Sequence, residues 1–136
     1  METLEKYRQI VKQLLTDHAS NNDSEIECQI ICDTEHDHYQ LVDIGWQNLH
    51  RIYACYIHID IKNGKIWIQH NMTEADLGQE LVARGIPRSD IILGLHPPYK
   101  RPYTDYGVAW RVKNQAAKLL ILYQAIAYIL RKLMQF

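Results

Sequence analysis

Apolar and polar residues alternate on both sides of an Asn-Gly pair between His58 and His70. Asn63 and Gly64 supply the positive φ angles that a two-residue type I′ turn requires, so this pattern predicts a β-hairpin. The turn fixes which residues face each other across the two strands. The predicted pairs on the buried face are Ile61 with Ile66, Ile59 with Ile68, and Ile57 with His70.

The opposite face of this hairpin has an unusual composition, because it pairs Asp60 with Trp67 and His58 with Gln69. A plain solvent face would carry Lys, Glu, Ser and Thr. An acid, an aromatic ring, an imidazole and an amide in one cross-strand patch favour a recognition surface instead. The alternative is that a second layer of structure covers the patch. We treat these four residues as candidate partner-binding residues.

The first half of the chain predicts one helix and a set of strands. Apolar residues recur at spacings of three and four, which indicates an amphipathic helix, at Leu4, Tyr7, Val11, Leu14 and His18. Strands are expected at Ile26–Cys32, Tyr39–Trp46, Arg51–Ile61 and Lys65–His70. Their short connections indicate an antiparallel meander, in which the third strand is central because it is apolar on both faces.

The second half predicts further helices around a proline-rich segment. Thr73 is expected to cap a second helix, and Gly85 to end it. Ile91–Leu95 reads as a short strand or an extended segment. The prolines between His96 and Thr104 exclude a regular helix or a central strand there, so this segment should be irregular. A last helix is expected from Trp110 onward, from its composition.

These elements together predict an α+β fold. We expect an antiparallel sheet of four to five strands, packed by the N-terminal helix and the second helix, in one domain over residues 1–109. An apolar C-terminal helical extension, which is a candidate contact element, then covers residues 110–136.

The extension has a different character from the rest of the chain. Its run from Leu119 to Leu130 is uncharged and apolar nearly all round, so it needs burial on more than one side. It is shorter than the roughly 20 residues that cross a bilayer, and we expect no membrane partner. The alternative is a membrane surface, since the basic residues at both ends of the run also suit anionic lipid. A homo-oligomer, at least a dimer, would cover it. The candidate oligomer contacts are Leu119, Leu120, Tyr123, Ile126 and Leu130.

Charge and cysteine content narrow the class of protein. The net charge of -1 hides an acidic body and a basic tail, since every acid precedes Arg111. An acidic body suits a protein partner better than phosphate neutralisation over its whole surface. The cysteines, Cys28, Cys32 and Cys55, are odd in number and lack CxxC spacing, which favours buried free thiols in a reducing compartment. No secretory leader pattern is evident, so we expect a cytoplasmic protein.

Three motifs suggest other chemistry. His36 and His38 could bind a metal with Asp33 or Asp37, although capping of a polar turn explains them more simply. Asp60 and Lys62, with Asp43 upstream, have the residue types of a Mg²⁺-dependent nuclease. Basic and aromatic residues alternate from Tyr99 to Tyr103, as in single-stranded nucleic-acid sites.

A protein contact explains the last motif better than a nucleic acid does. The prolines stiffen this loop, and an exposed arginine between tyrosines is typical of a binding hot spot. We therefore add Tyr99, Arg101 and Tyr103 to the candidate partner-binding residues.

The order of motifs along the chain resembles the XisI family, described as fdxN-element excision controlling factors of cyanobacteria. The resemblance rests on DTEHDHYQL at 33–41, IGW at 44–46, HIDIKNGKIWIQH at 58–70 and LGLHPPYKRPYTDY at 93–106. It covers about residues 1–108. The matching motif positions are Asp33, His38, Trp46, Arg51, His58, Asp60, Trp67, His70, His96 and Arg101.

The resemblance implies a non-enzymatic accessory factor in DNA recombination. It further implies an XisH-like companion protein with a nuclease-like fold, and a site-specific recombinase that does the cutting and is a second possible partner; direct contact with DNA stays open. It brings no catalytic residue, metal or cofactor, and we predict none. The chain departs from the family after Ala109, where the basic helix follows.

Overall fold

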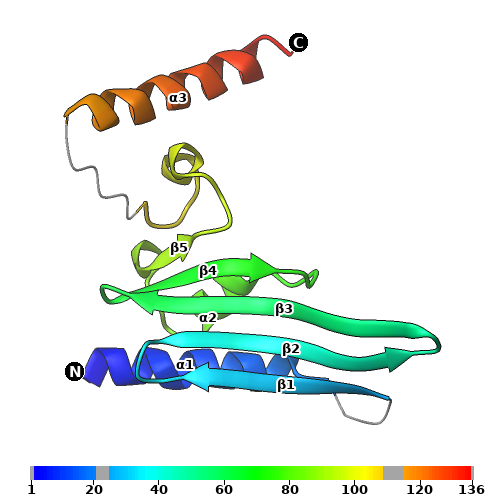
Figure 1. Cartoon of the computed structure of the whole chain (residues 1–136). Coiled ribbons are helices and arrows are strands. Elements are labelled where there is room, and N and C mark those ends of the chain that lie inside the picture. Colours follow the sequence, from blue (N-terminus) through cyan, green and yellow to red (C-terminus); the bar gives the residue numbers. More distant parts are fainter. Residues whose placement is uncertain (1, 21–24, 109–114, 136) are drawn as a thin grey trace.

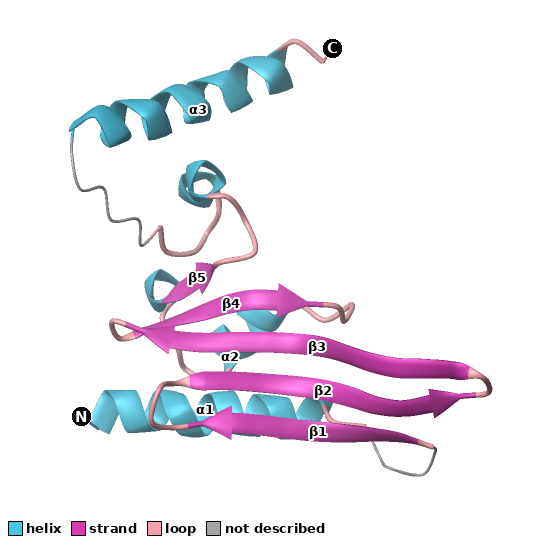
Figure 2. Cartoon of the chain, in the orientation of Figure 1, coloured by secondary structure: helices cyan, strands magenta, loops and turns pink. Residues whose placement is uncertain are grey.

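The computed structural model describes residues 2–20, 25–108 and 115–135. Figures 1 and 2 show a sheet with helices on one side and a separate helix at the C-terminal end. The helices are α1 (Glu2–His18), α2 (Leu77–Ala83) and α3 (Gln115–Leu133), with 3₁₀ helices η1 (Arg88–Asp90) and η2 (Pro98–Tyr103). The strands are β1 (Ile26–Asp33), β2 (His38–Gln47), β3 (His50–Lys62), β4 (Lys65–Asn71) and β5 (Ile91–Leu93).

The sheet follows the order of the chain, β1-β2-β3-β4-β5, so the predicted central position of β3 is confirmed. The first four strands form an antiparallel meander, and β5 pairs parallel to β4 at the edge. The parallel direction follows from the connection through α2, because a helical crossover brings the chain back to the end of the sheet where β4 began. The predicted α+β class is therefore confirmed.

One face of the sheet packs on α1 and α2 and forms the core (Figure 1). α1 contributes Tyr7, Val11, Leu14 and Leu15, as its periodicity predicted. The isoleucines at alternate positions of β3 and β4 meet them from the sheet side. These are Ile57, Ile59, Ile61, Ile66 and Ile68. The opposite face of β3 carries the polar side chains.

The Asn-Gly hairpin has the predicted turn, with φ of 52° at Asn63 and 74° at Gly64. Its near pairs are confirmed: Ile61 faces Ile66, Asp60 faces Trp67 and Ile59 faces Ile68. Two farther pairs are wrong, because His58 faces His70 and Ile57 faces Asn71. A bulge places Gln69 as one extra residue on β4, and the register beyond it slips accordingly.

α2 begins later than predicted. Asp76 is its N-cap, with a carboxylate oxygen that accepts from the Gln79 backbone N–H at 3.1 Å. The Thr73 hydroxyl instead belongs to the preceding turn, where it accepts from the Ala75 N–H. The predicted end is confirmed, because Gly85 has a φ of 97°.

Other local expectations need correction. The cysteines are not uniformly buried: Cys32 is exposed, and Cys28 and Cys55 are partly exposed. The proline-rich segment is not irregular throughout, since Pro98–Tyr103 forms the 3₁₀ helix η2. Proline suits the first position of such a short helix, where its missing N–H costs nothing. No helix among the described residues is long and apolar enough to span a membrane.

Candidate functional site

Asp60 lies at the centre of a polar cluster on the face of β3 opposite the helices. It comes from the middle of the sheet, where β2 and β4 flank it, and it is 6% exposed. Main-chain pairing brings His38 of β2 directly opposite it. His58 precedes it by two residues on the same strand and therefore lies on the same face. The sheet register thus assembles two imidazoles around one buried carboxylate.

Hydrogen bonds fix this arrangement. His38 Nδ1 and His58 Nε2 each lie 2.8 Å from Asp60 Oδ1. The Gln69 amide donates to the other oxygen, Oδ2, at 3.2 Å. Gln40 Nε2 lies 3.3 Å from His58 Nδ1. The two glutamines therefore orient the groups that meet at Asp60 Oδ1.

The charge of Asp60 follows from these contacts. Burial alone would raise the pKa of its carboxyl, but the hydrogen bonds from His38 and His58 outweigh that effect and hold the pKa below its usual value. The group is therefore a carboxylate at neutral pH. A buried anion with two imidazole partners and an exposed rim can bind a cation, or receive a hydrogen-bond donor from a partner protein.

Trp67 lies beside this cluster under an arginine from a distant segment. The Arg101 guanidinium carbon is 5.1 Å from the Trp67 ring centroid, and Nε donates to the Leu93 carbonyl oxygen at 3.4 Å. Arg101 is only 8% exposed, so the predicted exposure of this residue is wrong. The stacking on Trp67 explains the burial, because the flat guanidinium covers the ring. η2 is in part the second layer that covers the patch.

We expect Arg101→Ala to lower the unfolding midpoint, contrary to the neutral effect that an exposed side chain would have. The loss should be about 1–3 kcal/mol, since a buried cation–π contact and its packing disappear. Thermal unfolding followed by circular dichroism measures it. Arg51→Ala is the matched control, because Arg51 also stacks on a tryptophan, Trp46, at 5.6 Å but is exposed. Equal, small shifts in both variants would contradict this account.

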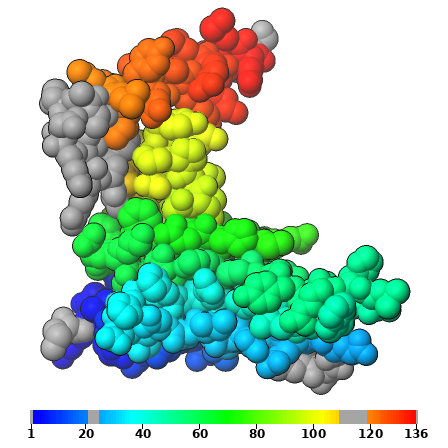
Figure 3. Space-filling view, viewed as in Figure 1, coloured from blue at the N-terminus to red at the C-terminus, as the bar shows by residue number. Residues whose placement is uncertain are grey.

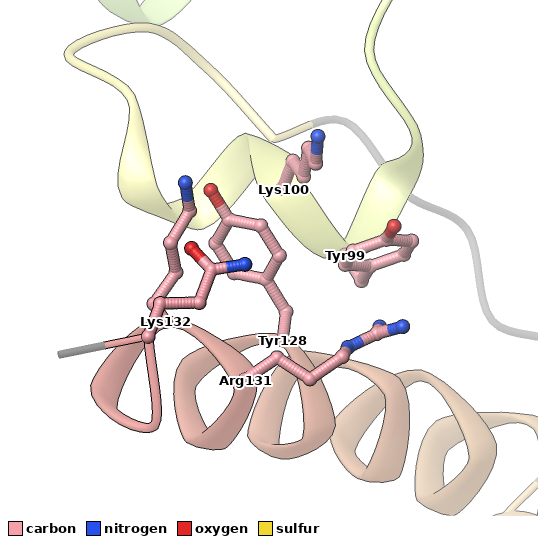
Figure 4. A pocket seen from close by; sticks show the side chains of 6 residues that line it. Tyr99, Lys100, Tyr128, Arg131 and Lys132 are labelled. Carbon is pink, nitrogen blue, oxygen red and sulfur yellow. The ribbon is translucent and has the colours of Figure 1, made fainter.

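The two tyrosines of η2 contact the C-terminal helix. The Tyr128 ring of α3 lies 6.0 Å from Tyr99 and 6.1 Å from Tyr103, centroid to centroid. Lys100 and Lys132 lie over the same ring at 5.2 and 5.9 Å. Figure 4 shows Tyr128 pointing from α3 toward η2. Tyr103 remains 51% exposed, as predicted.

A cavity of about 300 Å³ opens between η2 and α3. Tyrosine and cationic side chains dominate its lining, which consists of Tyr99, Lys100, Tyr128, Arg131, Lys132 and Gln135. Figure 3 shows α3 resting on the η2 segment, well away from β1 and β2. The structure therefore adds residues of the extension to the predicted Tyr99–Tyr103 motif.

The structure separates the residues of the nuclease motif. Asp43 pairs with Ala54, five positions along β2 from the residue that faces Asp60, which is about 17 Å at the usual rise per residue. Lys62 lies over the Trp67 ring at 5.1 Å. Asp43 therefore cannot share a metal ion with Asp60 in this arrangement.

The HxH motif is divided as well. The His36 Nδ1 atom lies 2.9 Å from the Asp33 carboxylate. The same carboxylate also accepts hydrogen bonds from the backbone N–H groups of Glu35 and His36. Asp33 therefore caps the turn, as the simpler interpretation expected. His38 belongs to the Asp60 cluster instead. Sequence reasoning missed the grouping of His38 and Gln40 with Asp60, which depends on the pairing of β2 with β3.

Comparisons with known proteins agree on one family. The model of the XisI protein family matches residues 1–108. A crystal structure of an XisI-like protein from Anabaena variabilis is 56% identical, with a TM-score of 0.75, over 78% of this chain and 99% of that chain. No match to a curated protein was found.

A second crystal structure, described as the fdxN element excision controlling factor XisI from Anabaena variabilis, is 32% identical. Its TM-score is 0.68, and the match covers 79% of this chain and 99% of that chain. The family match spans the sheet, α1, α2 and η2, and it ends before α3. This chain belongs to the XisI family.

Proposed function

We propose that this protein is a non-catalytic controlling factor for the excision of a DNA element and that it acts by binding an XisH-like companion protein. The observation that carries the proposal is its similarity to a solved protein described as an excision controlling factor, which it matches over 99% of that protein's chain. A recombinase would do the cutting, and this protein would regulate it through the companion.

The surface beside the Asp60 cluster supports a protein contact. Tyr103 is half exposed and Tyr99 is partly exposed on η2, and His58, Trp67 and Gln69 are partly exposed at the cluster. Tyrosine provides a large contact area at low conformational cost, and tyrosine and tryptophan recur at binding hot spots. Most of the side chains are already held by hydrogen bonds or ring contacts, which reduces the ordering cost on binding.

The cavity between η2 and α3 favours a second candidate function, contact with single-stranded nucleic acid. Its tyrosines could stack on bases, and its cations, Lys100, Arg131 and Lys132, could neutralise phosphates. Two of these cations belong to the extension beyond the family match. The contact would therefore be specific to chains that carry α3.

Tyr103→Ala is expected to weaken binding to an XisH-like companion protein. Loss of an exposed aromatic anchor should reduce affinity by about tenfold or more, with little change in the unfolding midpoint. Co-purification of the untagged protein with the tagged companion detects the complex, and calorimetric titration then measures the affinity. Tyr53→Ala is the matched control, since Tyr53 is 74% exposed at the other end of β3.

Two results would count against the proposal. One is the absence of any complex between the two wild-type proteins. The other is an equal effect of Tyr53→Ala and Tyr103→Ala on affinity. No complex, together with salt-sensitive binding of an oligonucleotide, would favour the second function. Mg²⁺-dependent DNA cleavage by the purified protein would overturn the non-catalytic assignment.

A further inference from the structure

We propose that His38, His58 and Asp60 form a binding site for a divalent transition-metal ion on the open face of the sheet. One ligand atom of each, the two imidazole nitrogens and a carboxylate oxygen, lies within 4.8 Å of the other two. This inference goes beyond the proposed function, since nothing in a companion-binding role requires an ion.

The donor set fits such an ion. Two imidazole nitrogens and one carboxylate oxygen are ligands that Zn²⁺ and its neighbours in the first transition row accept, with other positions left open. Bonds of about 2.1 Å would place neighbouring ligand atoms about 3.0–3.4 Å apart, depending on geometry. The two nitrogens now lie 2.8 Å from Asp60 Oδ1. The two nitrogens lie no more than 4.8 Å from each other, so shifts of up to about 1 Å in the two imidazole rings would admit the ion.

The strands hold the ligands ready. His38 and Asp60 face each other across β2 and β3, and His58 shares a strand with Asp60, so each backbone position is fixed by ladder hydrogen bonds. Gln69 holds Asp60 Oδ2 and leaves Oδ1 toward the imidazoles. Metal sites depend on such outer contacts to orient their ligands. The ligand side chains are ordered before the ion binds, so ion binding costs them little further conformational entropy.

The proton positions change in a defined way on binding. Without an ion, the imidazole N–H groups donate to Asp60 Oδ1. With an ion, His38 Nδ1 and His58 Nε2 bind it through their lone pairs, so each ring carries its proton on the other nitrogen. For His58 that nitrogen is Nδ1, which lies 3.3 Å from the Gln40 amide. A turn of this amide presents its oxygen to accept the new N–H.

Exposure and charge also suit an ion. The His38 and His58 side chains are 54% and 30% exposed, whereas that of Asp60 is 8% exposed. The ion therefore enters from solvent and keeps open positions for water or for a partner's side chain. A metal ion requires deprotonated ligands, and the Asp60 carboxylate supplies a buried negative charge for it.

The test uses the full chain without a histidine tag, stripped of metal with EDTA and titrated with Zn²⁺ in a calorimeter. We expect one ion per chain. His38→Gln and His58→Gln should each weaken Zn²⁺ binding by about 100-fold, and Gln69→Leu by about 10-fold, because it removes an orienting contact. His36→Gln is the matched control, since His36 also lies beside a carboxylate but belongs to no such three-residue group among the described residues.

Two further readouts separate the site from general effects on folding. Co²⁺ should give visible absorption bands in the wild type and in His36→Gln, but not in His38→Gln. Zn²⁺ should raise the unfolding midpoint only in the chains that bind it. His38 is the more exposed ligand, so His38→Gln keeps the test valid if His58→Gln fails to fold. Absent binding by the wild type, or equal affinity in His38→Gln, would overturn the proposal.

Discussion

Ile59→Ala is expected to lower the free energy of unfolding by about 2–5 kcal/mol. Ile59 is fully buried near the C-terminal end of β3, the central strand. It pairs with Tyr39 on one side and Ile68 on the other, both buried, so its loss leaves a cavity that none of the three strands can close. The variant loses the free energy gained by burying the removed carbon atoms, and the cavity that they leave behind adds a further loss of stability.

Denaturant unfolding followed by circular dichroism measures the effect, with Ile30→Ala as the control. Ile30 is also a strand isoleucine, but it lies on β1 and is 40% exposed, so its loss should cost less than about 1 kcal/mol. A loss below about 0.5 kcal/mol in Ile59→Ala, or similar losses in both variants, would contradict the core described here.

Removing the chain after Ala109 is expected to convert at least a dimer into a monomer. This is the second large effect, since the mass measured by light scattering would fall by half or more. α3 touches the rest of the chain through η2, and much of its apolar surface is exposed. The exposed fractions are 57% for Leu119 and Leu120, 70% for Tyr123, 48% for Ile126 and 53% for Leu130. Such a continuous apolar surface rarely stays in contact with water.

We propose a second copy of this chain as the occupant because the charges are complementary. Every one of the 16 acids lies before Arg111, whereas the segment from Arg111 onward carries only basic charges. In a symmetric pair, the basic segment of each copy could lie against the acidic body of the other. Part of the basic segment lies within residues 109–114, which are outside the described residues. The predicted start of this helix at Trp110 lies there too.

Ile126→Lys tests the same interface in the full chain. A lysine in the apolar surface of α3 should give a monomer that keeps the circular dichroism spectrum of the folded chain, because α3 lies apart from the core. Leu49→Lys is the control, since Leu49 is 93% exposed at the β2–β3 turn. If the full chain is already a monomer in solution without detergent, the interface idea fails.

The Asn63-Gly64 hairpin shows where sequence reasoning succeeds. Turn chemistry and alternation specify the same register locally, so the pairs closest to the turn were predictable. The bulge at Gln69 was not, because an extra residue in one strand leaves the alternation of its neighbours nearly unchanged. The same limit hid the Asp60 cluster, since the β2–β3 ladder also contains a register shift, near Leu41 and Val42.

Arg101 shows why exposure was harder to predict than secondary structure. A basic residue between prolines and tyrosines normally points to solvent, and no local pattern marks a tryptophan on a distant strand as its partner. The contact with Trp67 depends on the parallel addition of β5 to β4, which places η2 near the sheet. Long-range geometry therefore decides which members of the motif are available to a partner.

The uneven cover of the long β2–β3 hairpin has a consequence for its internal motions. The half nearest Asp60 carries buried residues against α1, whereas the residues from Trp46 to Arg51 are all exposed. Opening the far end therefore exposes little new apolar surface, while opening the near end breaks the core. One continuous ladder should thus exchange its amide hydrogens at two speeds, fast around the Asn48 turn and close to the rate of global unfolding around Ile57.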